Sequence, residues 1–160
     1  MVPTITKTAF YELISLPIKY TAMPIIDRQF PPSNIRQIQD YSTSELQAHP
    51  KDVLIATGVG CIAAPIIEEA FFRGALPLII TYATGCPEEL SLVISGVAFS
   101  ALHYSNKKAI SDVLFQCADC YFLFNPLKIA YGLPSTITAH VIHNSIQFVP
   151  ILKRTFWDKA

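Results

Sequence analysis

The sequence has few charged residues, and the two signs balance. Lysine, arginine, aspartate and glutamate make up 15% of the 160 residues, and the formal net charge is zero. Soluble domains are on average about 25% charged, so this deficit favours a chain that lies in a membrane. A neutral chain has no overall electrostatic attraction to nucleic acid, and we expect no nucleic-acid partner.

The sequence also lacks the patterns of a secreted protein. No basic segment leads into an apolar one at the N-terminus, as a cleavable signal peptide requires. The four cysteines follow no disulfide framework, although Cys117 and Cys120 form a C-x-x-C. In a redox enzyme that motif lies near a βαβ pattern, whereas here it lies in the apolar stretch "VLFQCADCYFLF". We therefore interpret both cysteines as packing residues.

The first 49 residues differ in character from the rest and are predicted to form a separate segment. Residues 8–26 are moderately apolar but are interrupted by charges and by Pro17 and Pro24, which suits an interfacial helix. Residues 27–49 are polar and predicted to be mostly loop. Pro50 suits the first position of a helix, and we place the boundary there.

From Pro50 to residue 160 the chain consists of apolar runs separated by short polar breaks. Each run is shorter than the roughly 20 residues of a perpendicular span, so core helices of a soluble bundle are an alternative. Helices on the surface of a soluble bundle carry a charged stripe, and in this chain that stripe is weak. Small residues of the kind that let membrane helices pack closely are frequent. We therefore predict an all-α, polytopic membrane bundle of about five helices. The expected helices are 53–68, 72–84, 90–104, 109–124 and 134–152.

Two adjacent glutamates interrupt the first long apolar stretch, "APIIEEAFFRGALPL". An ionisable group inside a membrane helix is costly and marks a functional site by default. Glu69 and Arg73 are four residues apart, so in a helix they form an ion pair on one face. Glu68 points about 100° away from Glu69, and it has no local partner.

Polar residues also occur at helical spacing near the C-terminus. In "AHVIHN", His140 and Asn144 are four residues apart and share one face of the expected helix, while His143 flanks that face. His103 ends another apolar run, "FSALHY". Two histidines and an amide at mid-helix need polar partners in an apolar setting, and we predict that Glu68 is that partner.

Three short motifs, in order, resemble the signatures of a known family. "EEAFFR" is E-E-x-x-x-R, "FSALH" is F-x-x-x-H and "HVIHN" is H-x-x-x-N. Together they resemble the CPBP family, which contains type II CAAX prenyl endopeptidases and bacteriocin-processing-like membrane proteins. The resemblance covers about residues 50–150. It implies an intramembrane protease core over residues 50–160.

The resemblance assigns roles by position. Glu68 matches the catalytic carboxylate, with His103, His140 and Asn144 completing the site. Glu69 and Arg73 match supporting positions, and His143 is not a signature residue.

The resemblance also implies a substrate class and a location. The substrates would be membrane-associated proteins or peptides, for which a prenylated C-terminus is the best-known case. The protein would contact membrane lipids as a multi-pass integral protein, in the cytoplasmic membrane if its source is bacterial.

Two mechanisms are compatible with these residues. In the first, Glu68 takes a proton from the attacking water with help from His103, while His140 and Asn144 donate to the oxyanion. In the second, Glu68, His103 and His140 bind Zn²⁺, which acidifies a bound water. No H-E-x-x-H motif is present, and the sequence leaves both mechanisms open.

Two alternatives to a protease use the same polar residues. A non-catalytic, truncated homologue would use the cluster for structure or for binding a partner. A transporter or proton relay would be expected to contain an inverted repeat, and none is visible. The protease mechanism instead requires that Glu68, His103, His140 and Asn144 meet in one polar cavity, with Glu69 turned away towards Arg73.

Overall fold

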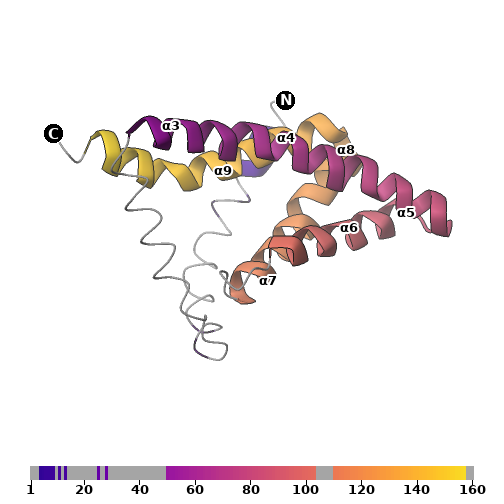
Figure 1. The fold of residues 1–160 in the computed structure, drawn as a ribbon. Helices are drawn as coiled ribbons and strands as arrows, with labels where there is room; N and C mark the ends of the chain where they lie inside the picture. Colours follow the sequence, from indigo (N-terminus) through magenta and orange to yellow (C-terminus); the bar gives the residue numbers. More distant parts are fainter. Residues whose placement is uncertain are drawn as a thin grey trace.

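The described part of the chain is helical throughout. The computed structural model describes residues 4–9, 11, 13, 25, 28, 50–103 and 110–157, apart from the side chains of 110–112 and 154. No strand occurs in these ranges (Figure 1), which confirms the all-α class. Most of the segment predicted over 1–49, and the basic loop "SNKK" at 105–108, lie outside the described residues.

The first long helix runs without a break from Pro50 to Thr84. Its parts are α3 (Pro50–Gly58), η1 (Val59–Ala63), α4 (Ala64–Glu69), η2 (Ala70–Ala75) and α5 (Leu76–Thr84), where η denotes a π-helical turn. The predicted break between residues 68 and 72 is therefore wrong, and two of the expected helices are one. The charges of Glu69 and Arg73 pair within the helix at 3.0 Å, so they do not force the chain out of it.

Three further helical segments follow the long helix. They are α6 (Glu88–His103), the continuous run of α7 (Ile110–Asp119), η3 (Cys120–Phe124) and α8 (Asn125–Tyr131), and α9 (Leu133–Phe156). The turn predicted at "GCPEE" is confirmed, since α5 ends at Gly85 with φ +71°. The break predicted at "NPLK" is wrong, because the helix continues to Tyr131 and ends at Gly132 with φ +79°. Glycine tolerates this left-handed region and so ends both helices.

Each of the three π turns lies just before a proline. Proline has no N–H and its ring collides with the carbonyl four residues earlier, so an ordinary helix would kink. Here the residue before each proline (Ala64, Leu76 and Asn125) donates its N–H to the carbonyl five residues back. The wider turn accommodates the ring, and this explains why helices continue through positions where sequence reasoning predicted a break.

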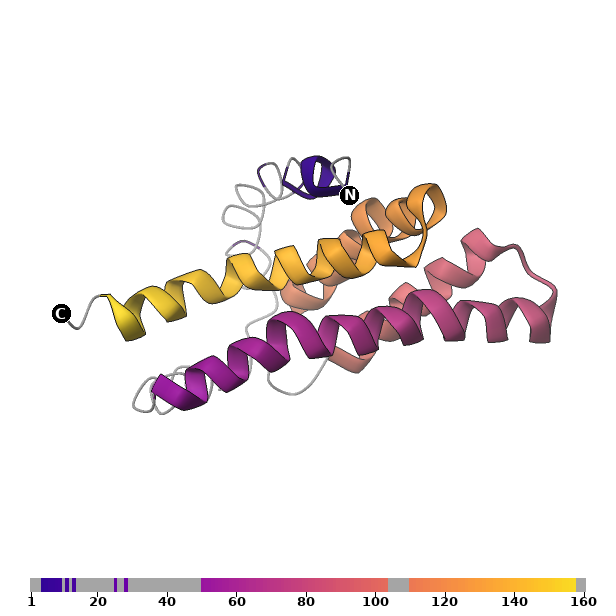
Figure 2. The same cartoon turned by 90° about the horizontal axis from the view of Figure 1, so that it is seen from above.

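The helices pack as two antiparallel pairs that share a core. Helix α9 lies alongside α3 and α4 in the opposite direction, so that its C-terminal end lies near the start of α3 (Figures 1 and 2). Helix α6 folds back against α5, and α8 packs against α9. This brings the middle of the long helix, the end of α6 and the middle of α9 together.

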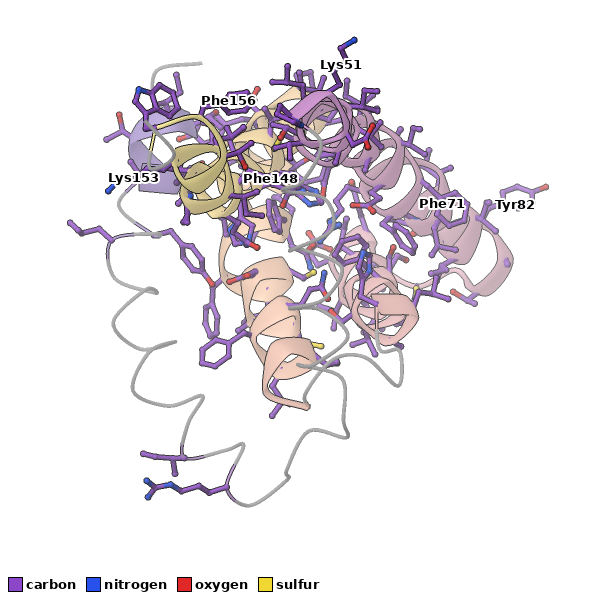
Figure 3. The ribbon with its side chains drawn as sticks, turned by 60° about the vertical axis from the view of Figure 1, so that its left-hand side comes forward. Lys51, Phe71, Tyr82, Phe148, Lys153 and Phe156 are labelled. Carbon is purple, nitrogen blue, oxygen red and sulfur yellow. The ribbon has the colours of Figure 1, made fainter. Side chains whose placement is uncertain are left out.

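The long helix is also the element with the clearest membrane character. Among the described residues it is the one helix long and apolar enough to cross a membrane, with 35 residues from Pro50 to Thr84. The bundle of about five membrane helices is thus not confirmed. At 1.5 Å per residue the helix is about 52 Å long, longer than the roughly 30 Å hydrocarbon layer. Many of its large apolar side chains are exposed, and Figure 3 shows Tyr82 pointing away from the helices.

The buried core lies between η2, α6, η3, α8 and α9. It consists of Phe72, Phe99, Cys120, Leu123, Phe124, Leu127 and Ala139. Gly96 permits the close approach of α6 to η3, because a Cβ atom at Gly96 would lie 3.1 Å from the Cβ of Cys120. The core therefore packs directly against the turn that follows Glu68 and Glu69.

Candidate active site

Glu68 lies between two histidines that come from two other helices. One carboxylate oxygen, Oε1, lies 3.6 Å from Nε2 of His103 at the end of α6. The other, Oε2, lies 3.6 Å from Nε2 of His140 in α9. The fold thus brings together three of the four residues expected at the site, and we call Glu68, His103 and His140 the acceptor cluster.

The other ring nitrogen of each histidine is bound to an acceptor. Nδ1 of His103 lies 2.8 Å from the carbonyl oxygen of Phe99, and Nδ1 of His140 lies 2.9 Å from Oε1 of Glu69. A carbonyl or carboxylate oxygen only accepts, so each Nδ1 carries the proton. In the neutral ring each Nε2 then carries a lone pair, and both lone pairs face Glu68.

With both rings neutral, the acceptor cluster places acceptors against acceptors, whereas a protonated Nε2 forms an ion pair with Glu68. A separation of 3.6 Å exceeds the roughly 2.7–3.2 Å of a direct N–H···O hydrogen bond, and two lone pairs repel. A water molecule resolves this conflict because it donates two hydrogens, one to the carboxylate and one to a histidine. Glu68 is 26% exposed and His103 27%, so the cluster is not sealed inside the protein. The chemistry that fits the arrangement is the holding and deprotonation of a water.

Glu69 forms the expected ion pair with Arg73. Both side chains are fully buried, and Nη1 of Arg73 donates to Oε1 of Glu69 at 3.0 Å. The guanidinium lies over the rings of Phe99 and Phe124, at 4.7 and 5.1 Å from their centroids. As expected, Glu69 turns into the core towards Arg73, and the same Oε1 also accepts the proton of Nδ1 of His140. Glu69 thus fixes the tautomer and the orientation of a site histidine.

Asn144 has a different partner from the one expected. Its Nδ2 donates to the carbonyl oxygen of Gly60 in η1 at 2.8 Å. The helical partner of that carbonyl, five residues on, would be Pro65, which has no N–H. Asn144 therefore satisfies a carbonyl that a proline leaves without a donor, and no contact with the acceptor cluster is found for it among the described residues.

A second proline in the long helix also leaves a carbonyl that a neighbouring helix bonds. Pro77 leaves the carbonyl of Phe72 in η2 without an N–H donor, and the hydroxyl of Ser95 in α6 donates to that carbonyl. The two prolines thus create docking points for α9 and α6. Both helices carry a histidine of the acceptor cluster.

His143 lies outside the acceptor cluster, as the motif comparison implied. Its Nε2 lies 2.7 Å from the amide of Gln147 and 3.9 Å from Asp119. Tyr11, from the N-terminal segment, donates its hydroxyl to the same Asp119. These contacts form a second polar group on another side of α9.

Three residues that shape the site received no site role from the sequence, although Phe99 belongs to the F-x-x-x-H motif. The ring of Phe99 packs 4.3 Å from the ring of His103 and 6.0 Å from that of His140. The ring of Phe124 packs 5.2 Å from that of His140, and Cys120 contacts Arg73. The F-x-x-x-H spacing was a usable signal for Phe99, since residues four apart share a helix face. Nothing local indicated Phe124 or Cys120, because their contacts span long sequence separations.

The proposed zinc ligands are close together but do not form a recognisable metal centre. Among the described residues no group of three or more histidine, cysteine, aspartate or glutamate side chains is placed to hold a metal ion. Zinc binding by Glu68, His103 and His140 stays a prediction, and we derive no step from it.

Comparison with known proteins identifies the family. Residues 50–146, more than half of the chain, match the family described as "Type II CAAX prenyl endopeptidase Rce1-like". No curated protein and no solved structure gave a significant match. The matched region contains the whole acceptor cluster, Glu69, Arg73 and Asn144, and it confirms the resemblance inferred from the three motifs. The chain belongs to the Rce1-like family of type II CAAX prenyl endopeptidases, which are membrane-embedded proteases.

Proposed function

We propose that this protein is an intramembrane endopeptidase that cleaves peptide bonds with a water held by Glu68, His103 and His140. One observation carries the proposal. A half-exposed carboxylate faces the Nε2 lone pairs of two histidines whose Nδ1 protons are already donated elsewhere. A carboxylate held between two imidazole rings in this way suits the deprotonation of a nucleophilic water.

The reaction follows from these positions. The water donates one hydrogen to Glu68 and the other to His103, so its oxygen lone pair points at the substrate carbonyl. As the oxygen attacks, Glu68 takes the proton and the carbonyl becomes an oxyanion. When the intermediate collapses, the C–N bond breaks and Glu68 returns the proton to the leaving amine. Glu68 thus ends in its starting state.

Asn144 and His140 are the proposed donors to the oxyanion. An amide nitrogen carries two hydrogens, and Asn144 uses one of them on Gly60, so the other is available. His140 donates from Nε2 after the ring has taken up a proton from solvent, and the Glu69 carboxylate that accepts from its Nδ1 stabilises the resulting imidazolium. A donor of this kind contributes about 10²–10³-fold to kcat in other hydrolases.

The proposed substrates are membrane-associated proteins or peptides, with a prenylated C-terminus as the first to test. Exposed apolar side chains follow the long helix on both sides of Glu68, among them Ile66 and Ile67. A lipid-facing site of this kind suits a substrate that is anchored by its own prenyl chain. We further propose that the protein is a multi-pass membrane protein, in the cytoplasmic membrane if its source is bacterial.

A non-catalytic role fits the site less well. A polar cluster used only as structural support is expected to be buried, as Glu69 and Arg73 are. Glu68 and His103 are instead about a quarter exposed, at the point where three helices meet. The family match favours the protease for the same residues.

The proposal is tested with purified protein in liposomes and a farnesylated peptide ending in a CAAX sequence. We expect the wild type to release the C-terminal tripeptide, detected by mass spectrometry. Glu68→Gln should lower the rate by about 10²–10⁴-fold, the usual loss when a general base is removed. Glu88→Gln is the matched control, because Glu88 is an exposed helical glutamate that pairs with Lys128. Cleavage by Glu68→Gln at the control rate would contradict the proposal.

The membrane assignment has a separate test. We expect the protein to remain in the membrane pellet after alkaline carbonate washing of cells that express it. Release into the soluble fraction, with Glu68→Gln and wild type behaving alike, would contradict the membrane assignment without bearing on the chemistry of Glu68.

A further inference from the structure

A buried row of contacts lies behind His140 and leads to Cys120. Oε1 of Glu69 accepts from both Nδ1 of His140 and Nη1 of Arg73. The second terminal nitrogen of Arg73, Nη2, donates to Sγ of Cys120 at 2.7 Å. We call Glu69, Arg73 and Cys120 the buried cluster. It connects a cysteine in η3 with the histidine that faces Glu68.

The pairing of Arg73 with Glu69 is unusual in one respect. A guanidinium prefers to bond a carboxylate through two parallel N–H···O bonds, one to each oxygen. Here Arg73 bonds one oxygen, and Oε2 of Glu69 has no hydrogen-bond partner among the described residues. The nitrogen that would complete the pair is the one bonded to Cys120. Cys120 therefore holds the guanidinium away from the two-bond geometry.

We propose that Cys120 is a positioning residue for the protease reaction. By holding Nη2 of Arg73, it fixes how the guanidinium meets the Glu69 carboxylate and hence the direction of Oε1, which accepts from Nδ1 of His140 and so turns Nε2 of that ring towards Glu68. The inference rests on the proposed function. It assigns a role to the second cysteine of the C-x-x-C, which the sequence had indicated as packing.

The surroundings of Cys120 hold its sulfur in place. Gly96 lets α6 approach so closely that an added Cβ would lie 3.1 Å from the Cβ of Cys120. Ser100, one turn further along α6, also hydrogen-bonds the sulfur. A methyl group at Gly96 would therefore displace Cys120 without removing its thiol.

The first test needs no substrate and measures which tautomer the His140 ring adopts. In ¹⁵N-histidine spectra of the protein in detergent micelles, His140 is assigned by the loss of its signals in His140→Gln. We expect a single Nδ1–H tautomer in the wild type and a mixture of tautomers in Cys120→Ala. Cys120→Ser retains an acceptor for Arg73 and should restore the wild-type signals. Cys117→Ala, the matched control in the same motif, should leave them unchanged.

Kinetics with the farnesylated peptide provide the second measurement. Cys120→Ala should lower kcat about tenfold, the usual scale for a residue that orients a site residue, with KM unchanged. Gly96→Ala should do the same through displacement of Cys120. A role in packing alone would lower the amount of folded protein and would leave kcat per folded molecule at the wild-type value.

The outcomes separate this inference from the proposed function. If Cys120→Ala shows the wild-type His140 tautomer, or if Cys120→Ser does not restore it, Cys120 is not a positioning residue. If Glu68→Gln cleaves peptide normally, the proposed function fails, whatever the spectra of Cys120→Ala show. If Glu68→Gln is inactive and Cys120→Ala matches Cys117→Ala in both measurements, this inference alone is overturned.

Discussion

The acceptor cluster and the buried cluster begin at adjacent residues and yet differ in exposure and in bonding partners. Glu68 is 26% exposed and faces lone pairs, whereas Glu69 is fully buried and is held by Arg73. One residue along a helix is a rotation of about 100°, enough to turn one carboxylate towards water and the other into the core. His140 contacts both glutamates and joins the two regions. Glu68 is thus available for chemistry, whereas Glu69 is held in the core and orients the histidine that the two regions share.

The largest expected effect is on stability, from a change in the buried cluster. Glu69→Ala leaves the Arg73 charge buried without its partner, which costs about 3–5 kcal/mol of folding free energy. The measurement is denaturant unfolding in detergent. The same substitution at the exposed Glu88–Lys128 pair should cost about 0–1 kcal/mol. Equal losses from Glu69→Ala and Glu88→Ala would remove the distinction between a buried and an exposed pair.

The next effect separates two roles of Asn144. Asn144→Ala removes the donor to Gly60, so we expect the free energy of unfolding to fall by about 1 kcal/mol. It also removes the proposed oxyanion donor, so we expect kcat to fall about 10²-fold. Pro65→Ala supplies a backbone N–H that can bond the same carbonyl. In the double variant Asn144→Ala/Pro65→Ala the stability should return while kcat stays low. Recovery of both would show that Asn144 acts only by docking α9.

The smallest expected effect comes from metal removal. The mechanism proposed for the acceptor cluster uses protein groups and water, so chelation with EDTA or phenanthroline should leave kcat and KM unchanged. The control is a zinc protease treated in the same liposomes. Loss of activity on chelation, with recovery on adding Zn²⁺, would favour the metal mechanism and would make Glu68, His103 and His140 its ligands.

Local spacing predicted much of the site. The four-residue separation identified the Glu69–Arg73 pair, and the cost of a lone polar group in an apolar helix indicated that Glu68 and the histidines must meet. These inferences succeed because helix geometry and desolvation act on residues that are visible in the sequence. The class of the fold followed from the same periodicity.

The remaining features depend on the three-dimensional arrangement. A proline inside a helix usually kinks or ends it, but at Pro65 and Pro77 π turns carry the helix through, and neighbouring helices bond the carbonyls that the prolines leave without a donor. The bond from Glu69 to His140 joins residues 71 positions apart, and no local rule ranks it above other pairings. The proposed role of Cys120 depends on the structure, in which its sulfur accepts a hydrogen bond from Arg73.

The most direct test measures turnover and melting temperature on the same preparations of Glu68→Gln and Glu69→Gln in liposomes. Both substitutions keep the shape of the side chain and remove its charge. The account predicts that Glu68→Gln loses turnover and melts like the wild type, whereas Glu69→Gln melts at a lower temperature because Arg73 loses its counter-charge. Two variants that lose turnover and melting temperature together would contradict the division between the acceptor cluster and the buried cluster.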